Sequence, residues 1–429
     1  MAEIFSRLIT LPNCTKRDVS GILDRLFDCG LGSRNMPNKS ATSDVAVVTL
    51  TPVSHQGLYW LALALTEALG PTRIRKLIEQ FGTAERVFRA SLTELEATGM
   101  RAVSAQSLAT GKSLELAQTE CAKASEAGAR IVALSDPEYP PRLKEIYDPP
   151  VILFVKGRVE ILAQPGIAMV GTRHPTPYGS AMAERLSTDL AARGLVIISG
   201  LARGIDTASH RGAVAAKGKT VGVLGTGIDV MYPKENTRLT EQIVALGGAL
   251  VTEFPVGTPP TPQNFPIRNR IISGMSAGVL VVEAAEYSGT RITSRLALEQ
   301  NRDVYAVPGN VTNKNAWGPN TLIKQGAKLV ATWEDVWEEL PTDVQNVLSS
   351  QQNESPEQET ASLFPDEVSS PHEKNILKLL KADESTHIDE LVELLENEMS
   401  PSEIFAALFE LELNGKVKQL PGKNFVKSF

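Results

Sequence analysis

The chain has few of the features of a secreted or membrane-spanning protein. Its 3 cysteines, Cys14, Cys29 and Cys121, lie far apart and have no partnering histidines. This spacing argues against a disulfide framework and a metal site. No apolar run approaches the roughly 20 residues of a membrane span, and residues 1–10 lack the pattern of a secretory signal. We expect a cytoplasmic protein with no metal and no membrane partner.

Common nucleotide-binding motifs are missing as well. A nicotinamide fingerprint needs G-x-G-x-x-G after the first strand and an acidic residue after the second, and neither is present. The glycines of residues 222–227 have the wrong spacing for it. No G-x-x-x-x-G-K-S/T occurs either, which leaves motor-type nucleotide hydrolysis without support. We expect no cofactor.

The chain also lacks the overall positive charge that is common in nucleic-acid-binding proteins. Its 43 basic and 50 acidic residues give a net charge of −7. Net charge says little about a local site, because the distribution of charge decides what binds there. Between Arg173 and Arg295 basic residues recur at expected strand ends and helix starts, whereas most of the acidic excess lies elsewhere, largely after Trp333. A nucleic-acid partner is therefore not excluded.

What is present is the composition of a soluble globular protein, with 42% hydrophobic and 22% charged residues. A chain of 429 residues is too long for one compact core. Breaks in the pattern predict five segments: a poorly ordered N-terminal arm (1–55), a small helical domain (56–125), a Rossmann-like domain (126–341), a flexible linker (342–371) and a winged-helix domain (372–429).

The central segment alternates short β-branched runs with amphipathic segments. Apolar strands separated by helices specify a mostly parallel sheet that is covered on both faces, so we predict an α/β fold of the Rossmann-like class. The expected strands are 131–134, 151–155, 167–170, 195–198, 220–224, 249–253, 278–282, 304–307 and 328–330, and the expected helices include 178–193, 206–217, 236–246 and 290–301.

Two smaller segments flank this sheet and leave alternatives open. The turn at residues 69–73 resembles a degenerate helix-hairpin-helix, which can bind DNA through turn amides; a packing module without a ligand is the other interpretation. At the C-terminus, three helices and a basic hairpin predict a winged helix. Its third helix carries Glu403, Glu410 and Glu412 and no cation, which favours protein docking or packing over DNA reading.

Two glycine turns follow two of the expected strands, and each carries an arginine. The first is Gly171-Thr172-Arg173, and the second is Ser199-Gly200-Leu201-Ala202-Arg203-Gly204. Because the carboxyl ends of parallel strands form the ligand crevice of such a sheet, amides and cations at these turns describe a phosphate site. Lys234 and residues 264–270 add cations, and several phosphate positions along one edge suit a strand of nucleotides better than a single cofactor. Phe265 and Tyr232 can stack bases, although core packing is the alternative for either aromatic alone.

Several runs of the sequence resemble the DNA-processing protein A family, DprA, also called Smf. The resemblance covers about residues 56–429, and its specific motifs are AMVGTRHPTPYG, ISGLARGIDTASHRGA, VGVLGTGIDVMYP, TEFPVGTPPTPQNFPIRNRIISGMS, VVEAAEYSGTRITSRLALEQNRDVYAVPGN and GPNTLIKQGA. The resemblance implies a mediator of natural transformation and DNA recombination that binds single-stranded DNA without sequence preference, loads RecA onto it and forms a homodimer. It also implies a sterile-alpha-motif-like or helix-hairpin-helix domain, a Rossmann-like domain and often a winged-helix tail.

In this family the arginine after the Val-Gly-Thr turn and the basic residue beside the Tyr-Pro motif contact single-stranded DNA, and the corresponding positions here are Arg173 and Lys234. Together with the glycine turns and the run 264–270, these positions give the full set of expected DNA-binding residues: Gly171, Arg173, Gly200, Arg203, Gly204, Lys234, Asn264, Phe265, Arg268, Asn269 and Arg270.

No catalytic residue is predicted, so we expect a protein that is not an enzyme. Nucleotide-processing enzymes of similar fold, such as the cytokinin-activating phosphoribohydrolases, carry a P-G-G-x-G-T loop, whereas this chain has Pro308-Gly309-Asn310 and, separately, Ser288-Gly289-Thr290. We expect Glu283, at a strand end, to orient an arginine or backbone groups. His174 and His210 lack a nucleophile and an orienting carboxylate at motif spacing. A nucleotide-processing hydrolase or nucleotide sensor that uses the same crevice is the alternative.

Overall fold

The structure is a computed structural model, and it describes residues 53–286, 288–354, 375–377, 379–380, 386–395, 399–413, 417–420 and 422–427. Most of the N-terminal arm expected for residues 1–55 therefore lies outside the described residues, as do Cys14 and Cys29. Within the described part of the chain, no helix has both the length and the apolar character needed to span a membrane.

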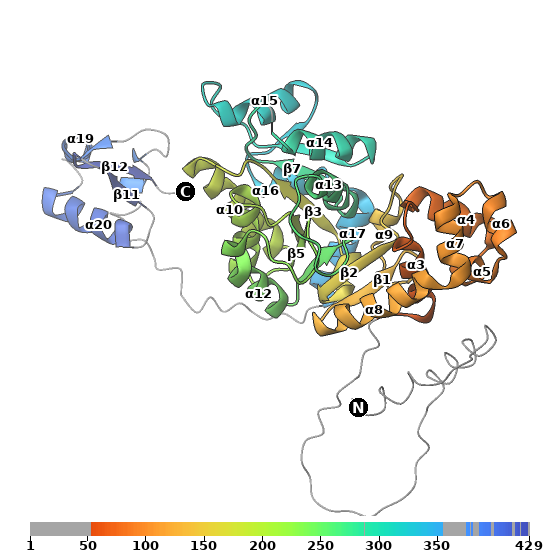
Figure 1. The fold of residues 1–429 in the computed structure, drawn as a ribbon. Coiled ribbons are helices and arrows are strands. Elements are labelled where there is room, and N and C mark those ends of the chain that lie inside the picture. The colour runs from red at the N-terminus through yellow and green to blue at the C-terminus, as the bar shows by residue number, and fades with distance from the viewer. Residues whose placement is uncertain are drawn as a thin grey trace, which may run out of the picture. The chain divides into compact units, whose positions relative to one another are not determined.

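A nine-stranded sheet forms the centre of the α/β domain (Figure 1), and it contains every strand that the sequence predicts. Its order is β1-β2-β6-β5-β4-β3-β7-β8-β9. The strands from β6 to β9 in this order run parallel, whereas β2 pairs antiparallel with both β1 and β6. The strands are β1 (Arg130–Ala133), β2 (Ile152–Gly157), β3 (Gly166–Val170), β4 (Val196–Ser199), β5 (Thr220–Val223), β6 (Ala249–Thr252), β7 (Gly278–Val281), β8 (Asp303–Ala306) and β9 (Lys328–Leu329). The predicted mostly parallel sheet is confirmed.

The central strands are apolar along their whole length because helices cover both of their faces. Alternate residues of β3 belong to different cores: Ala168 and Val170 lie in one cluster of buried residues, and Ile167 and Met169 lie in the other. This alternation is the geometry of a strand buried on both sides. The covering helices are α10 (Pro177–Ala192), α11 (Ile205–Ala215), α12 (Thr237–Ala245), α13 (Asn264–Met275), α14 (Thr290–Glu299) and α15 (Trp317–Lys324), with short elements α9 (Pro141–Lys144), η1 (Val159–Ala163), η2 (Lys234–Asn236) and η3 (Lys314–Ala316).

Within the described residues, six helices precede the sheet, as the pattern of residues 56–125 predicts. They are α3 (His55–Ala64), α4 (Pro71–Phe81), α5 (Ala84–Arg89), α6 (Leu92–Ala97), α7 (Ala102–Thr110) and α8 (Lys112–Glu126). The turn at Gly70 starts α4 with Pro71 in the first position, where the missing N–H costs no helical hydrogen bond. Leu61 and Leu63 of α3 belong to the same core cluster as Ile131 of β1. The helical segment and the sheet therefore share one apolar core.

After the sheet, the structure differs from the predicted linker. Helix α16 (Trp333–Trp337) is followed by α17 (Thr342–Glu354), which begins where the sequence predicts flexible chain. Val344 and Leu348 lie one helical turn apart and are buried in the second core cluster. Because the segment is polar overall, the sequence did not indicate that these two apolar residues would be buried. The remainder of the expected linker, residues 355–371, lies outside the described residues.

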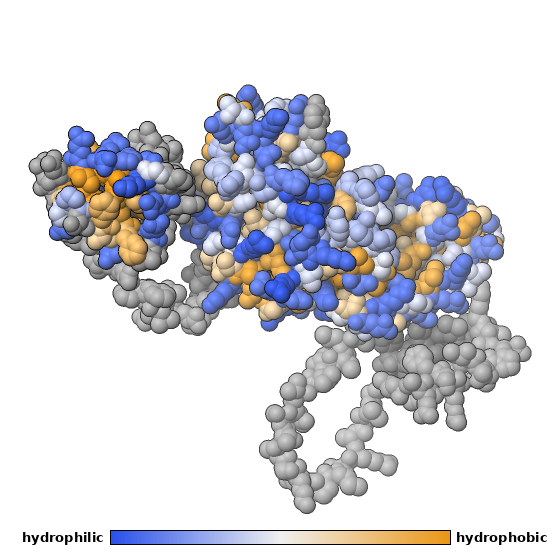
Figure 2. All heavy atoms as spheres, turned by 60° about the vertical axis from the view of Figure 1, so that its left-hand side comes forward, coloured by the Kyte–Doolittle hydropathy of each residue, from blue (hydrophilic) through white to orange (hydrophobic). Residues whose placement is uncertain are grey.

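The C-terminal domain is a winged helix with its own core, as predicted. It contains α19 (Ile388–Leu395), α20 (Pro401–Leu413) and a small sheet in the order β10-β12-β11, formed by β10 (Thr386–His387), β11 (Val417–Leu420) and β12 (Asn424–Lys427). Its apolar cluster includes Leu391, Ile404 and Phe425. Figure 2 shows further apolar residues on the surface of this domain, where Phe405 and Phe409 of α20 are exposed one turn apart.

Candidate nucleic-acid interface

A cavity at the carboxyl edge of the sheet lies where the strand order reverses. β3 is flanked by β4 on one side and β7 on the other, so the connections that follow β3 and β7 run in opposite directions and open a crevice at the carboxyl ends of these strands. A cavity of about 590 Å³ occupies this crevice. We call it the switch-point pocket; it is lined chiefly by residues of the turn after β3, of α13 and of the start of α14, including Thr172, Arg173, His174, Phe265, Arg268, Asn269, Ser288, Gly289, Thr290 and Thr293.

The turn after β3 presents Arg173 at this pocket. Gly171 has no room for a side chain, because an added Cβ would meet Ile205 and the backbone oxygen of Glu283. The amide of Thr172 donates to that same oxygen at 2.7 Å, and the carbonyl of Thr172 accepts from the amide of Ile205 at 3.2 Å. The turn is therefore fixed on both sides, whereas the side chain of Arg173 is exposed. The backbone beside Arg173 is thus fixed by the bonds of Thr172. The guanidinium of Arg173 forms no hydrogen bond or ion pair with the described residues.

The turn after β4 is different, because its polar groups are used within the protein. The amides of Gly200 and Ala202 both donate to the carboxylate of Asp206, at 3.1 and 3.3 Å. Arg203 is exposed but forms an ion pair with Glu235 at 2.5 Å. Gly204 has a φ of +80° and approaches the backbone oxygen of Thr172, so glycine is required there. The amides of Gly200 and Ala202 are therefore occupied by a carboxylate, and the amide of Ile205 donates to the carbonyl of Thr172.

Asp206 lies at the start of α11 and is fully enclosed. Burial raises the pKa of Asp206 to about 6, against the opposing effects of Arg268 and of the two amides that it accepts from. Burial also lowers the pKa of Arg268 to about 10, with the nearby charge of Arg173 acting in the same direction. Arg268 therefore stays charged at neutral pH. The two guanidinium groups lie close enough to repel each other, which makes the floor of the pocket positive.

Helix α13, which the sequence analysis did not predict, arranges the residues of the 264–270 run. Its pocket-lining residues Phe265, Arg268, Asn269 and Ile272 follow the i, i+3, i+4, i+7 pattern of one helical face. This periodicity is the signal that could have revealed the helix, but Pro266 and the two arginines interrupt its apolar pattern. Because Pro266 lies in the first turn, it breaks no helical hydrogen bond there.

Arg268 is buried beneath the pocket and is not exposed at the edge of the sheet. Its side chain is 4% exposed and donates to the carbonyl oxygens of Gly200, at 2.7 Å, and Val223. The guanidinium packs where a Cβ of Gly200 would be, which explains the glycine at that position. Asn264, at the start of the helix, donates to the carbonyl of Gly225 at 3.1 Å. These contacts bind α13 to the ends of β4 and β5.

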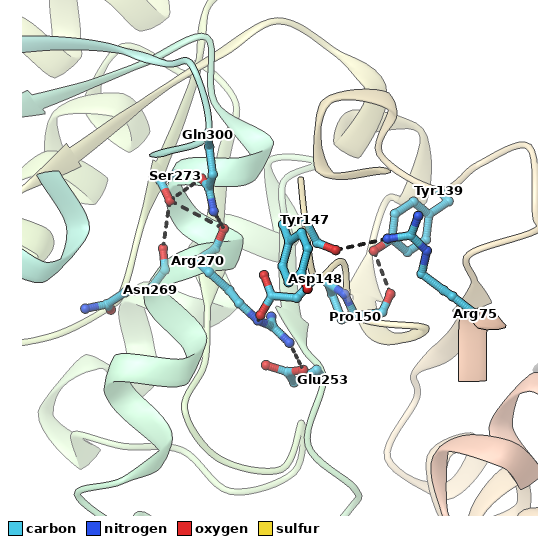
Figure 3. Close-up of polar contacts among 10 residues, drawn as sticks. All are labelled: Arg75, Tyr139, Tyr147, Asp148, Pro150, Glu253, Asn269, Arg270, Ser273 and Gln300. Atoms are coloured by element: carbon cyan, nitrogen blue, oxygen red, sulfur yellow. Dashed lines mark hydrogen bonds and ion pairs between the residues drawn. The ribbon is translucent and has the colours of Figure 1, made fainter. Parts of the chain in front are cut away.

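Arg270 points to the opposite side of α13 (Figure 3). It is 7% exposed, and it pairs with Glu253 at 2.6 Å and with Asp148 at 3.1 Å. The carbonyl of the neighbouring Tyr147 accepts from Arg75 of α4 at 3.0 Å. Arg270 is therefore held within the protein and does not line the switch-point pocket, and its DNA contact stays a prediction, as does that of Arg268. Both partners of Arg270 come from distant parts of the chain, which the sequence could not indicate.

An aromatic pair forms the rim of the pocket. The rings of Tyr232 and Phe265 have centroids 5.7 Å apart, and the guanidinium carbon of Arg173 lies 5.8 Å from the Phe265 centroid. Tyr232 is 41% exposed. Lys234 follows at the start of η2; it is exposed but does not line the pocket. Asn236 anchors this segment by donating to the carbonyl of Leu201 at 2.8 Å.

Two candidate acid–base residues, Glu283 and His210, form structural hydrogen bonds. Glu283 is buried and accepts from the amide of Thr176 at 2.9 Å and from the Thr176 hydroxyl at 2.5 Å, so the expected orienting role toward backbone is confirmed. Burial lowers the pKa of His210 to about 3, and its ring bonds the Thr220 hydroxyl at 2.7 Å. His174 is exposed at the pocket. The described residues contain no cluster of side chains suited to a metal ion.

One part of the pocket lining was missed from the sequence. It consists of Ser288, Gly289 and Thr290 together with Ile292 and Thr293 of α14. Small polar residues at a helix start carry no strong signal on their own, and only the position of α14 beside α13 brings them to the pocket.

Comparisons with known proteins agree on one family. The family model described as DNA recombination-mediator protein A matches residues 130–341, and the one described as DprA winged helix domain matches residues 355–423. The DNA processing protein DprA of Bacillus subtilis is 46% identical over 217 residues, which is 50% of this chain and 73% of that protein. Protein Smf of Synechocystis is 32% identical over 399 residues, covering 86% of this chain and 98% of that protein. The X-ray structure of DNA processing protein A from Streptococcus pneumoniae has a TM-score of 0.58 at 34% identity, covering 67% of this chain and 98% of that one.

Proposed function

Because the chain belongs to the DNA recombination-mediator protein A family, we propose that it binds single-stranded DNA without sequence preference at the switch-point pocket and loads RecA onto that DNA. The observation that carries this proposal is the exposed guanidinium of Arg173 beside the Tyr232–Phe265 pair. A cation for the backbone and an aromatic surface for the bases are the two components of sequence-tolerant single-strand binding.

In this proposal Arg173 holds a backbone phosphate through two parallel N–H donors. Phe265 and Tyr232 stack on one or two bases, since every base has a π-face and no base edge needs to be read. Lys234 lies two residues beyond Tyr232 and binds a neighbouring phosphate. Asn269 lines the pocket and hydrogen-bonds the strand.

The buried residues of the predicted set have supporting roles. Gly171, Gly200 and Gly204 allow the close backbone approaches that bring the two turns and Arg268 together. Arg268 places a positive charge beneath the phosphate without direct exposure, and Arg270 fixes the orientation of α13. Asn264 fixes the start of the same helix. Arg203, paired with Glu235, makes at most a peripheral contact.

The proposal also covers partners and chemistry. The protein is a homodimer and a DNA mediator in transformation and recombination, and it is not an enzyme. Support for the last point is that Glu283 and His210 are buried and hydrogen-bonded within the protein, and that the carboxylate of Asp206 accepts from two backbone amides. The domain limits given above for residues 56–125, 126–341 and 372–429 are part of the same proposal.

A gel-shift comparison tests the binding and the mediator role together. Single- and double-stranded DNA of equal length are titrated with the full chain, with and without RecA. Preferential shift of the single strand and a mixed complex with RecA are expected. Equal affinity for both DNAs would reject the pocket as a single-strand site, and absence of a mixed complex would reject RecA loading.

A second assay tests the absence of catalysis. The protein is incubated with nucleoside monophosphates and with NAD, and released base is measured by chromatography. No release above the protein-free control is expected. Turnover that disappears in Glu283→Gln would instead establish a nucleotide-processing hydrolase in this crevice.

A further inference from the structure

The lining of the switch-point pocket around the start of α14 carries polar groups that the proposed DNA contacts leave unused. The Ser288 hydroxyl and the Nε of Arg268 are enclosed and have no hydrogen-bond partner among the residues that the structure describes. Thr290 and Thr293 are only 6% and 2% exposed, and neither hydroxyl bonds another residue of the described segments. Buried polar groups nearly always have partners, so a group of unpartnered ones around one cavity points to a ligand.

The backbone at the same wall has the electrostatics of an anion site. Helix α14 is ten residues long, begins at Thr290, and has neither a side-chain cap nor an acidic residue in its first turn. The amides of Arg291 and Ile292 are used by the carbonyls of Ser288 and Gly289. The amide of Gly289 has no backbone acceptor in the described part of the chain. The positive end of a helix without a cap is a favourable position for a phosphate.

We propose that the start of α14 binds a second phosphate of the same DNA strand, adjacent to the phosphate held by Arg173. Arg173 and Thr290 line the same cavity of about 590 Å³, with Phe265 also in its wall. In this proposal consecutive phosphates of one strand contact Arg173 and the start of α14, while a base lies on Phe265. This assignment rests on the proposed function, and it specifies that the pocket holds a dinucleotide step rather than one phosphate.

Gly289 offers a substitution that separates charge from structure. An added Cβ would have no heavy atom within 4 Å, so a side chain fits without a clash. Aspartate and asparagine have nearly the same shape and are both good residues before a helix. Only aspartate adds a negative charge where the second phosphate is expected. Gly289→Asp should therefore lose phosphate binding while keeping the folded state at least as stable, and Gly289→Asn is its matched control.

The binding assay uses the full chain and two competitors of a labelled oligothymidylate: dithymidylate with and without a 5′-phosphate. The wild type and Gly289→Asn should prefer the phosphorylated dinucleotide about tenfold, the equivalent of one charge-assisted hydrogen bond. Gly289→Asp should bind both dinucleotides alike. For the oligothymidylate, the slope of log affinity against log salt should fall by about 0.7 in Gly289→Asp only.

Thr290→Val and Thr290→Ser provide a second pair, since only valine removes the hydroxyl. Thr290→Val should weaken the preference for the 5′-phosphate, and Thr290→Ser should retain it. Equal preferences and equal salt slopes in all of these variants would overturn the second phosphate position. If Arg173→Glu also bound oligothymidylate normally, the proposed function itself would fail; if Arg173→Glu alone lost binding, only the α14 assignment would fail.

Discussion

The two glycine turns at the carboxyl edge of the sheet look alike in sequence and differ in the folded protein. Both follow a buried parallel strand and both carry an arginine. The turn after β3 leaves the Arg173 guanidinium exposed beside Phe265. The turn after β4 gives its amides to Asp206 and pairs Arg203 with Glu235. One turn is therefore available to a ligand, and the other supports it.

The difference lies in Asp206 and Arg268, which together fill the space behind the second turn. Asp206 satisfies amides that would otherwise attract an anion, and Arg268 packs on Gly200 and bonds its carbonyl. A carboxylate already at a helix start excludes a phosphate from the same place. Positive charge in the pocket thus comes from Arg173 above and Arg268 below, and the second turn contributes rigidity.

Replacing Arg268 should give the largest effect, on stability. Arg268→Met removes a buried cation that donates to two carbonyl oxygens. It also leaves the nearby charge of Asp206 without its partner. Breaking a buried pair in this way costs about 3–5 kcal/mol of unfolding free energy. Denaturant titration followed by circular dichroism measures it. Arg203→Met replaces the exposed arginine of the turn after β4 and should change the unfolding free energy by less than about 1 kcal/mol. Equal losses of unfolding free energy in the two variants would contradict the different roles of the buried and the exposed arginine.

Charge reversal at Arg173 should mainly affect binding. Arg173→Glu loses one charge-assisted phosphate contact, worth about 1.5–3 kcal/mol, so single-strand affinity should fall about tenfold to a hundredfold. Fluorescence anisotropy with labelled oligothymidylate measures the affinity. Arg203→Glu is the control from the second turn, and a loss there as large as in Arg173→Glu would contradict the proposed division of roles.

Asp206 should make stability depend on pH in a defined direction. Its pKa rises from 3.8 to about 6 on folding, so its contribution to stability is fully present below about pH 3.8 and is lost as pH rises through about 6. The unfolding free energy of the wild type relative to Asp206→Asn should therefore decrease between pH 4 and pH 6. Parallel denaturant titrations across this range test it. A difference that increases over the same range would show that folding lowers the pKa of Asp206 instead of raising it.

The exposed ion pair of the second turn should give the smallest effect. In the wild type, Arg203 pairs with the carboxylate of Glu235 at 2.5 Å. Glu235→Gln removes this carboxylate, so the Arg203 side chain becomes available to a ligand. Single-strand affinity should increase less than threefold, because an exposed pair contributes little. The effect should vanish when Arg203 is also replaced by methionine. A gain that persists in the double variant would assign it to the lost negative charge of Glu235 alone.

Much of the fold could be predicted because parallel strands covered on both faces must be apolar along their length, as β3 and β4 are. Arg173 could be placed at a ligand crevice for the same reason. The burial of Arg268 and Arg270 could not be predicted, since their partners Gly200 and Glu253 lie directly after β4 and β6. The role of the residues at the start of α14 could not be predicted from the sequence either. Their polar groups indicate a binding site only once the fold places them at the pocket without partners among the described residues.

The salt dependence of single-strand binding tests the central claim most directly. Affinity for oligothymidylate is measured over a range of salt concentrations for the wild type and for the double variant Arg173→Glu, Lys234→Glu. Each lost phosphate contact lowers the slope of log affinity against log salt by about 0.7 for single strands. The double variant should bind much more weakly, and its slope should be smaller by about 1.4. Unchanged affinity and slope would show that DNA does not bind at this pocket.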